Sequence, residues 1–138
     1  MRGGAPVVLS IACHTGSFAG KKDSLGEAMI KTRPGPVAFI GASQVSHPYG
    51  NILLGKALLQ GAYARRIATS GELLRYATSR LSHPPAWDPG AFLLDRAIQY
   101  FTPEELPLAR VREDHVRMYN LLGDPALRIF FPKDTLGM

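Results

Sequence analysis

The chain contains a single cysteine, Cys13, in a place where a thiol could act as a nucleophile. It follows the apolar run of residues 6–12 and begins a loop that contains Gly16 and Gly20. In open parallel sheets, reacting groups lie beyond the carboxyl ends of strands. A nucleophilic thiol also needs a base and donors for an oxyanion, and amides near a glycine-rich turn can be such donors. Spacing alone leaves two alternatives open, a reactive thiol and an inert buried one.

Four histidines could accept the proton of this thiol. His14 is adjacent to Cys13, but neighbours near a strand end tend to point to opposite faces. His47 follows the next apolar run and could face Cys13 from the other side, or it could be an ordinary loop residue. His83 lies in a proline-rich loop and His115 in a charged segment, so we expect both to be surface residues.

Two carboxylates could complete a triad, but each has a structural explanation. Ser24 and Glu27 have the spacing of a capping box, in which each side chain binds the other residue's amide at a helix start. Asp124 lies between Gly123 and Pro125, which is typical of a tight turn. We therefore predict structural roles for both acids.

The elements that must position these residues alternate between strands and helices, which predicts an α/β domain. Residues 6–12 and 36–41 are continuous aliphatic runs, typical of buried strands in a parallel sheet. The predicted helices cover residues 24–32, 51–66 (with Asn51 as cap), 71–81 and 91–101, with a further helix start at 102–105. In the second helix, Leu54, Leu58 and Ala62 share one face; in the fourth, Leu94, Ala97, Ile98 and Phe101 do so. Residues 111–122 are predicted as mixed helix or turn, and 126–131 as a last strand.

Composition limits the classes of function. At 138 residues the chain fits one domain, residues 1–138, and no apolar run approaches the length of a membrane span. The net charge is +5, but the basic residues are scattered and not interleaved with aromatics, so we predict no nucleic-acid binding. One cysteine excludes a multi-cysteine zinc site, and the loop after Cys13 lacks a phosphate-binding Gly-x-x-x-x-Gly-Lys motif. We predict neither a metal site nor a cofactor.

Four segments together resemble the gingipain-type family of cysteine peptidases, which have a caspase-like fold. Residues 13–18 (Cys-His-Thr-Gly-Ser-Phe) resemble the nucleophile signature, and residues 26–29 (Gly-Glu-Ala-Met) resemble a family helix. Residues 36–43 resemble the strand that leads to the specificity pocket, and residues 119–127 resemble a late Leu-Gly-Asp turn. The likeness covers residues 6 to 131, with the segments in the family's order.

The resemblance implies a caspase-like, mostly parallel sheet flanked by helices, with Cys13 as the thiolate nucleophile of an endopeptidase. It implies an oxyanion loop formed by Cys13, His14 and Gly16, and a substrate-binding segment with Ser43, Gln44, His47 and Tyr49. The family's base histidine belongs to an earlier His-Gly segment, which would precede Met1. We therefore expect the chain to be the C-terminal half of the domain and weak or inactive alone.

The resemblance also implies a peptide or protein substrate and a secreted or cell-surface location. A basic side chain before the scissile bond is a family expectation only, because no acidic residue occurs in residues 42–50. A truncated sheet would expose the edge beside the Cys13 strand, which predicts self-association. The main alternative is a catalytically degenerate caspase-like module for binding or scaffolding, and the other is an unrelated α/β domain.

Overall fold

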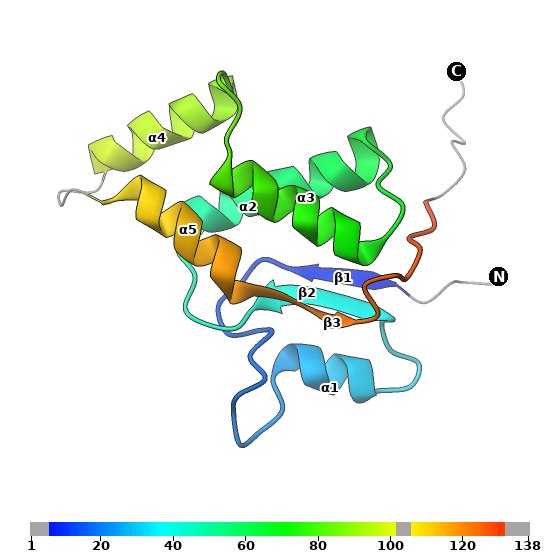
Figure 1. The fold of residues 1–138 in the computed structure, drawn as a ribbon. Coiled ribbons are helices and arrows are strands. Elements are labelled where there is room, and N and C mark those ends of the chain that lie inside the picture. Colours follow the sequence, from blue (N-terminus) through cyan, green and yellow to red (C-terminus); the bar gives the residue numbers. More distant parts are fainter. Residues whose placement is uncertain (1–5, 102–105, 132–138) are drawn as a thin grey trace.

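The computed structural model describes residues 6–101 and 106–131, which form an α/β arrangement around a small sheet (Figure 1). Strands β1 (Val7–Ser10), β2 (Ala38–Ala42) and β3 (Tyr119–Gly123) lie in the order β1-β2-β3. β1 pairs parallel with β2, and β3 pairs antiparallel with β2. The α/β class is confirmed, whereas a mostly parallel sheet is not seen among these strands.

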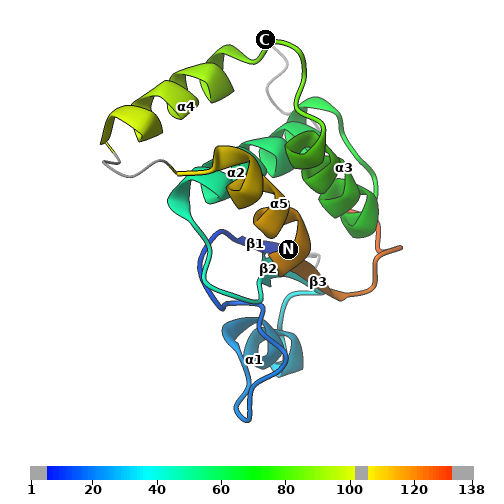
Figure 2. The same ribbon diagram turned by 60° about the vertical axis from the view of Figure 1, so that its left-hand side comes forward.

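Helices cover both faces of the sheet. They are α1 (Leu25–Lys31), α2 (Pro48–Leu59) with the π-helical turn η1 (Gln60–Ala64), α3 (Ser70–Ser82), α4 (Pro89–Phe101) and α5 (Leu108–Met118). Helix α1 lies on one face of the sheet, and α2, α3 and α5 lie on the other (Figures 1 and 2). Helix α4 lies beyond these three helices, on their side away from the sheet (Figure 2).

The main core fills the space between the sheet and the helices α2 and α3. All five residues of β2 are buried, as expected for a strand covered on both faces. The predicted helix face is confirmed, since Leu54, Leu58 and Ala62 all belong to the core. This packing fixes the end of β2, from which the loop to α2 departs.

The helix starts show which capping predictions were right. Ser24 caps α1, with its Oγ accepting the Glu27 amide at 3.3 Å and the Glu27 carboxylate accepting the Ser24 amide at 2.9 Å. The prediction that Asn51 caps the next helix is wrong. The cap is His47, whose Nδ1 accepts the Tyr49 amide at 3.1 Å, because Pro48 already fits the first helical position.

The last described segment differs most from the prediction. The third strand is Tyr119–Gly123, and residues 126–131 contribute only an isolated bridge between Thr69 and Arg128. A turn at Asp124 separates the two segments, and the Asp124 carboxylate accepts the Ala126 amide at 2.8 Å. The structural role predicted for Asp124 is therefore observed. The helix start predicted at residues 102–105 lies outside the described residues.

Helix α4 is amphipathic but covers little. It has no buried residue, and Phe101 of the predicted apolar stripe is exposed. Its attachment is polar: Asp95 accepts the Tyr49 hydroxyl at 2.7 Å and forms an ion pair with Arg112 at 2.9 Å. These bonds join α4 to α2 and α5.

One edge of β1 has no neighbouring strand among the described residues. Self-association through this edge remains a prediction. In the part of the chain that the structure describes, no helix has the length and apolar character needed to cross a bilayer.

Candidate active site

Cys13 lies beyond the carboxyl end of β1, after Ile11 and Ala12, and its side chain is exposed. The thiol is therefore outside the core, so the alternative of a buried cysteine is wrong. The position matches the expected place of a reacting group at the carboxyl end of a parallel strand. Within the described sheet, however, β2 is the central strand and β1 lies at the edge.

The Cys13 loop is fastened to the end of β2 by its own backbone. The His14 amide donates to the Gln44 carbonyl at 3.0 Å, and the Gly16 amide donates to the Ala42 carbonyl at 2.9 Å. His14 adopts a positive φ of 57°, which turns the chain sharply after Cys13. A Cβ on Gly16 would lie 2.7 Å from the Gly41 carbonyl oxygen, so only glycine permits this close approach. Because both amides are already used, their role here is to hold the loop.

Within the described residues, Ser46 forms the hydrogen bonds to the Cys13 sulfur. The Ser46 amide donates to Sγ at 3.4 Å, and the Ser46 hydroxyl lies 3.5 Å from Sγ. A protonated thiol can donate in turn to the Ser46 carbonyl at 3.4 Å. Hydrogen bonds from Ser46 hold the pKa of the Cys13 thiol below its ordinary value. The Ser46 hydroxyl is the larger cause and the Ser46 backbone amide is the second.

Ser46 itself belongs to a buried chain of hydrogen bonds. The Asn51 side-chain amide donates to Ser46 Oγ at 2.8 Å, and the Tyr119 hydroxyl donates to Asn51 Oδ1 at 2.7 Å. Burial raises the pKa of Tyr119 to about 12, so its hydroxyl remains a donor at neutral pH. The chain thus links the start of β3 to the exposed sulfur through α2.

None of the four histidines, all of which lie in the described residues, is hydrogen-bonded to Cys13. His115 is 1% exposed, which corrects the expectation that it is a surface residue. Its Nδ1 lies 2.7 Å from the Val111 carbonyl, so it carries the proton, and its Nε2 accepts the His47 amide at 3.1 Å. His115 was misjudged because charged neighbours conceal that it lies on the inner face of α5.

His47 and His115 together hold the loop that carries Ser46. His47 caps α2 through Nδ1, and its other ring nitrogen, Nε2, takes no part in the cap. His14 is exposed, and so is His83, as predicted. Therefore no histidine of this chain is hydrogen-bonded to the Cys13 thiol as a catalytic base would be.

The four residues expected to bind substrate have different surroundings. Gln44 is exposed beside the Cys13 loop, and His47 is partly exposed. The Ser43 hydroxyl donates to the Met118 carbonyl at 3.0 Å. Tyr49 is fully buried, with its hydroxyl bonded to Asp95 and Arg112, so its side chain is not presented to a peptide.

A hollow of about 290 Å³ lies beside the loop that carries Gln44. It is lined by Gln44, Val45, Asp114, Arg117 and Met118. Asp114 supplies an acidic group that residues 42–50 lack, because it comes from α5. Arg117 is paired with Glu113 one helical turn away.

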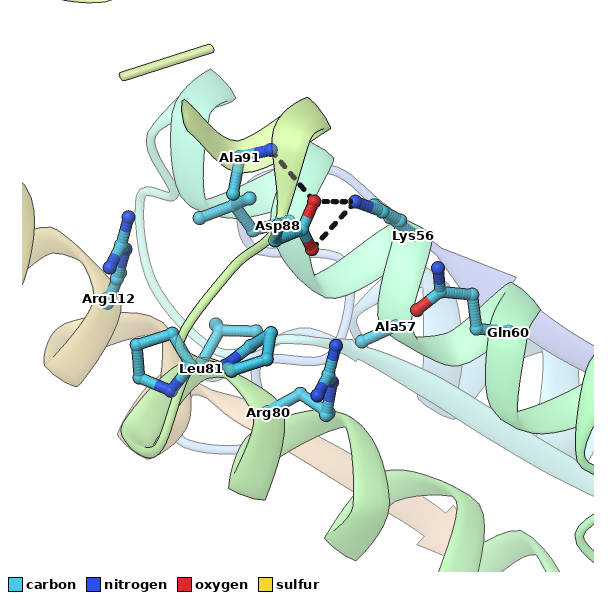
Figure 3. Close-up of a pocket in the computed structure, with 11 residues that line it drawn as sticks. Lys56, Ala57, Gln60, Arg80, Leu81, Asp88, Ala91 and Arg112 are labelled. Atoms are coloured by element: carbon cyan, nitrogen blue, oxygen red, sulfur yellow. Dashed lines mark hydrogen bonds and ion pairs between the residues drawn. The ribbon is translucent and has the colours of Figure 1, made fainter. Parts of the chain in front are cut away.

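A second hollow, shown in Figure 3, lies between α2, α3 and the start of α4. Its volume is about 30 Å³, which suits a water molecule and not a substrate side chain. Lys56 on its wall is held by the Asp88 carboxylate at 2.6 and 2.8 Å. Across the described ranges, no group of three or more metal-ligating side chains comes together.

The sequence model of peptidase family C25 matches residues 1–130 of the chain. The chain belongs to this family. The resemblance of the chain to the gingipain-type family is therefore confirmed, and the α/β layout is compatible with a caspase-like fold. No curated protein and no solved structure matches the chain.

Membership of family C25 makes this a domain related to cysteine peptidases, which are hydrolases of protein substrates. The geometry supplies an exposed sulfur that accepts the Ser46 amide and lies 3.5 Å from the Ser46 hydroxyl. The sequence pattern singled out Cys13 as a candidate, but it did not indicate the contact with Ser46 or the hydrogen bonds from Ser46 through Asn51 to Tyr119. The sequence did indicate in part that Ser46 and Cys13 lie close together, because each follows one of two adjacent predicted strands.

Proposed function

We propose that this chain supplies the nucleophile of a family C25 cysteine endopeptidase, with the Cys13 thiolate attacking the peptide carbonyl. The observation that carries the proposal is the exposed Cys13 sulfur, which receives the Ser46 amide and faces the Ser46 hydroxyl. A thiol becomes a useful nucleophile when its surroundings favour the thiolate near neutral pH.

In the proposed reaction, the sulfur forms a bond to the carbonyl carbon and the carbonyl oxygen becomes an oxyanion. The intermediate collapses with loss of the amine and leaves an acyl thioester on Cys13, which water then hydrolyses. The amides of His14 and Gly16 are bonded to carbonyls of the neighbouring chain. Within this loop we therefore assign the oxyanion to the Cys13 amide and the loop-holding role to His14 and Gly16.

The proposed base is a histidine supplied from outside this chain. A departing amine must receive a proton, and in cysteine peptidases the histidine that deprotonates the thiol returns it. None of the four histidines described above is bonded to Cys13. This supports the view that the chain is the C-terminal part of a catalytic domain, and amide hydrolysis by the chain alone should be weak.

We propose that the hollow next to Gln44 receives a substrate side chain and that Asp114 favours a basic one. Asp114 is exposed on α5 and lines the hollow together with Gln44. The Gln44 carbonyl is bonded to the His14 amide, so the hollow is adjacent to the nucleophile loop. His47 remains the other proposed contact from the Ser43–Tyr49 segment.

An activated ester tests the nucleophile without the missing base. The p-nitrophenolate leaving group needs no proton, so the thiolate alone can be acylated by p-nitrophenyl acetate. The expected result is a burst of one p-nitrophenolate per chain that Cys13→Ala abolishes, with little hydrolysis of peptide amides. A folded protein without a burst would overturn the proposal and favour the binding or scaffolding alternative.

A further inference from the structure

The hydrogen bond from Ser46 to Cys13 depends on where one hydroxyl proton points. A serine hydroxyl has a single hydrogen and can also accept. Ser46 Oγ accepts the side-chain amide of Asn51 at 2.8 Å. Its own hydrogen is then available for another acceptor. The Cys13 sulfur lies 3.5 Å away, and the Tyr119 hydroxyl oxygen is the other acceptor within reach of Ser46.

The direction of this bond depends in turn on the orientation of the Asn51 amide. A reversed amide would present its oxygen to Ser46 and would take up the hydroxyl hydrogen. The Tyr119 hydroxyl favours the observed orientation, because it donates to Asn51 Oδ1 at 2.7 Å while the NH₂ group faces Ser46.

Tyr119 is itself held firmly. It is 4% exposed, its backbone pairs with Ala42 at the end of β2, and its ring stacks on that of His115 at 6.2 Å. The backbone of Asn51 is fixed in α2, because its backbone amide donates to the His47 carbonyl at 3.0 Å. Four elements, β2, β3, α2 and α5, thus contribute to the orientation of one side-chain amide.

We propose that Asn51 and Tyr119 are positioning residues for the nucleophile, which direct the Ser46 hydroxyl hydrogen toward the Cys13 sulfur and so favour the thiolate. The inference deepens the proposed function and rests on it. The titratable groups around the sulfur are His14 in its own loop, His47 next to Ser46, and Tyr119 from β3. No carboxylate, ammonium or guanidinium group within residues 6–101 and 106–131 is bonded to Cys13 or Ser46.

The test is a double-mutant cycle read by the pH dependence of Cys13 alkylation with iodoacetamide. Because Cys13 is the only cysteine, whole-protein mass spectrometry reports its reaction directly. Ser46→Ala should slow alkylation at pH 7 by roughly threefold to tenfold, since it removes a donor to the thiolate. Tyr119→Phe should slow it by about twofold or more in the wild-type background and should have no effect in the Ser46→Ala background.

Ser70→Ala is the matched control, because Ser70 is also buried and donates its hydroxyl to the Asp124 carbonyl at 2.9 Å, without contact to Cys13. It should leave the alkylation profile unchanged. Asn51→Leu should act like Tyr119→Phe, and circular dichroism identifies any variant that fails to fold. An unchanged profile for Tyr119→Phe, or an equal effect in both backgrounds, would overturn the inference.

The ester burst separates this inference from the proposed function. A burst without the Tyr119–Ser46 coupling would keep the nucleophile and discard the positioning role. If Tyr119 and Ser46 were coupled but no ester burst occurred, the hydrogen-bond geometry around the thiol would be supported. The proposed peptidase chemistry, on which the inference rests, would then be wrong.

Discussion

The Cys13 sulfur and the Ser46 hydroxyl oxygen lie 3.5 Å apart, although the two residues are 33 positions apart in the chain. Their contact follows from the parallel pairing of β1 with β2, in which Ser10 lies opposite Gly41. Both loops leave the same edge of the sheet, so residues a few positions beyond each strand can meet. The register of two strands thus brings Cys13 and Ser46 together.

Gly16→Ala should separate the Cys13 loop from β2. The added Cβ would lie 2.7 Å from the Gly41 carbonyl oxygen, and a backbone atom cannot turn aside as a side chain can. We expect the free energy of unfolding to fall by about 2 kcal/mol, as for an overpacked site. Urea denaturation measures this loss, and an unchanged midpoint would show that the loop does not lie against β2.

Gly50→Ala tests the packing of α2 on the buried His115. A Cβ at this position would lie 2.4 Å from the imidazole ring, which is held by the Val111 carbonyl and the His47 amide. We expect a loss of about 1–3 kcal/mol in the free energy of unfolding.

The control for Gly50→Ala is Gly55→Ala in the same helix. A Cβ on Gly55 meets its nearest neighbour, Ile11, at 3.7 Å, which is an ordinary contact. This variant should gain about 1 kcal/mol from the higher helix propensity of alanine. Equal effects of the two substitutions would contradict the close contact between α2 and His115.

Asp114→Asn tests the acidic group in the hollow next to Gln44. Acylation of Cys13 by an arginine thioester should slow by about twofold to fivefold relative to a leucine thioester, the size expected for an exposed ion pair. The ratio of the two rates is the measurement, since it cancels any change in the thiol. A constant ratio would remove Asp114 from the proposed specificity.

Alkaline pH should destabilise the fold through two buried tyrosines. Burial is the first cause that raises the pKa of Tyr49 and of Tyr119, each to about 12. A raised pKa gives stability that is complete below the unfolded pKa of about 10 and is lost as the pH rises toward 12. The free energy of unfolding should therefore fall from pH 9 to 11, and Tyr49→Phe should make the fall less steep. An equal slope in the variant would contradict this origin.

The sequence predicted the parts of the fold that depend on local pattern. Continuous aliphatic runs located β1 and β2, and the spacing of Leu54, Leu58 and Ala62 located the inner face of α2. Strand β3 was missed because Tyr119–Gly123 is short and shows neither alternation nor β-branched residues. Its pairing with β2 is a tertiary contact that no local pattern indicates.

Of the candidate site, only the position of Cys13 was predictable from the sequence. The position of Cys13 after an apolar run indicated the end of a strand, and the structure agrees. The bonds among Ser46, Asn51 and Tyr119 join three elements, so their distances exist only in the folded chain. His115 illustrates the same limit, because its burial depends on which face of α5 meets α2.

The most direct test of the central claim compares the alkylation of Cys13 in the native protein and in the same protein unfolded in urea. The rate of reaction with iodoacetamide is measured against pH in both states, so the unfolded chain supplies the unperturbed thiol. Donation from Ser46 predicts a lower pH midpoint in the native state, in line with the lowered pKa of Cys13. A native midpoint equal to or above the unfolded one would contradict the account of Cys13 as an activated nucleophile.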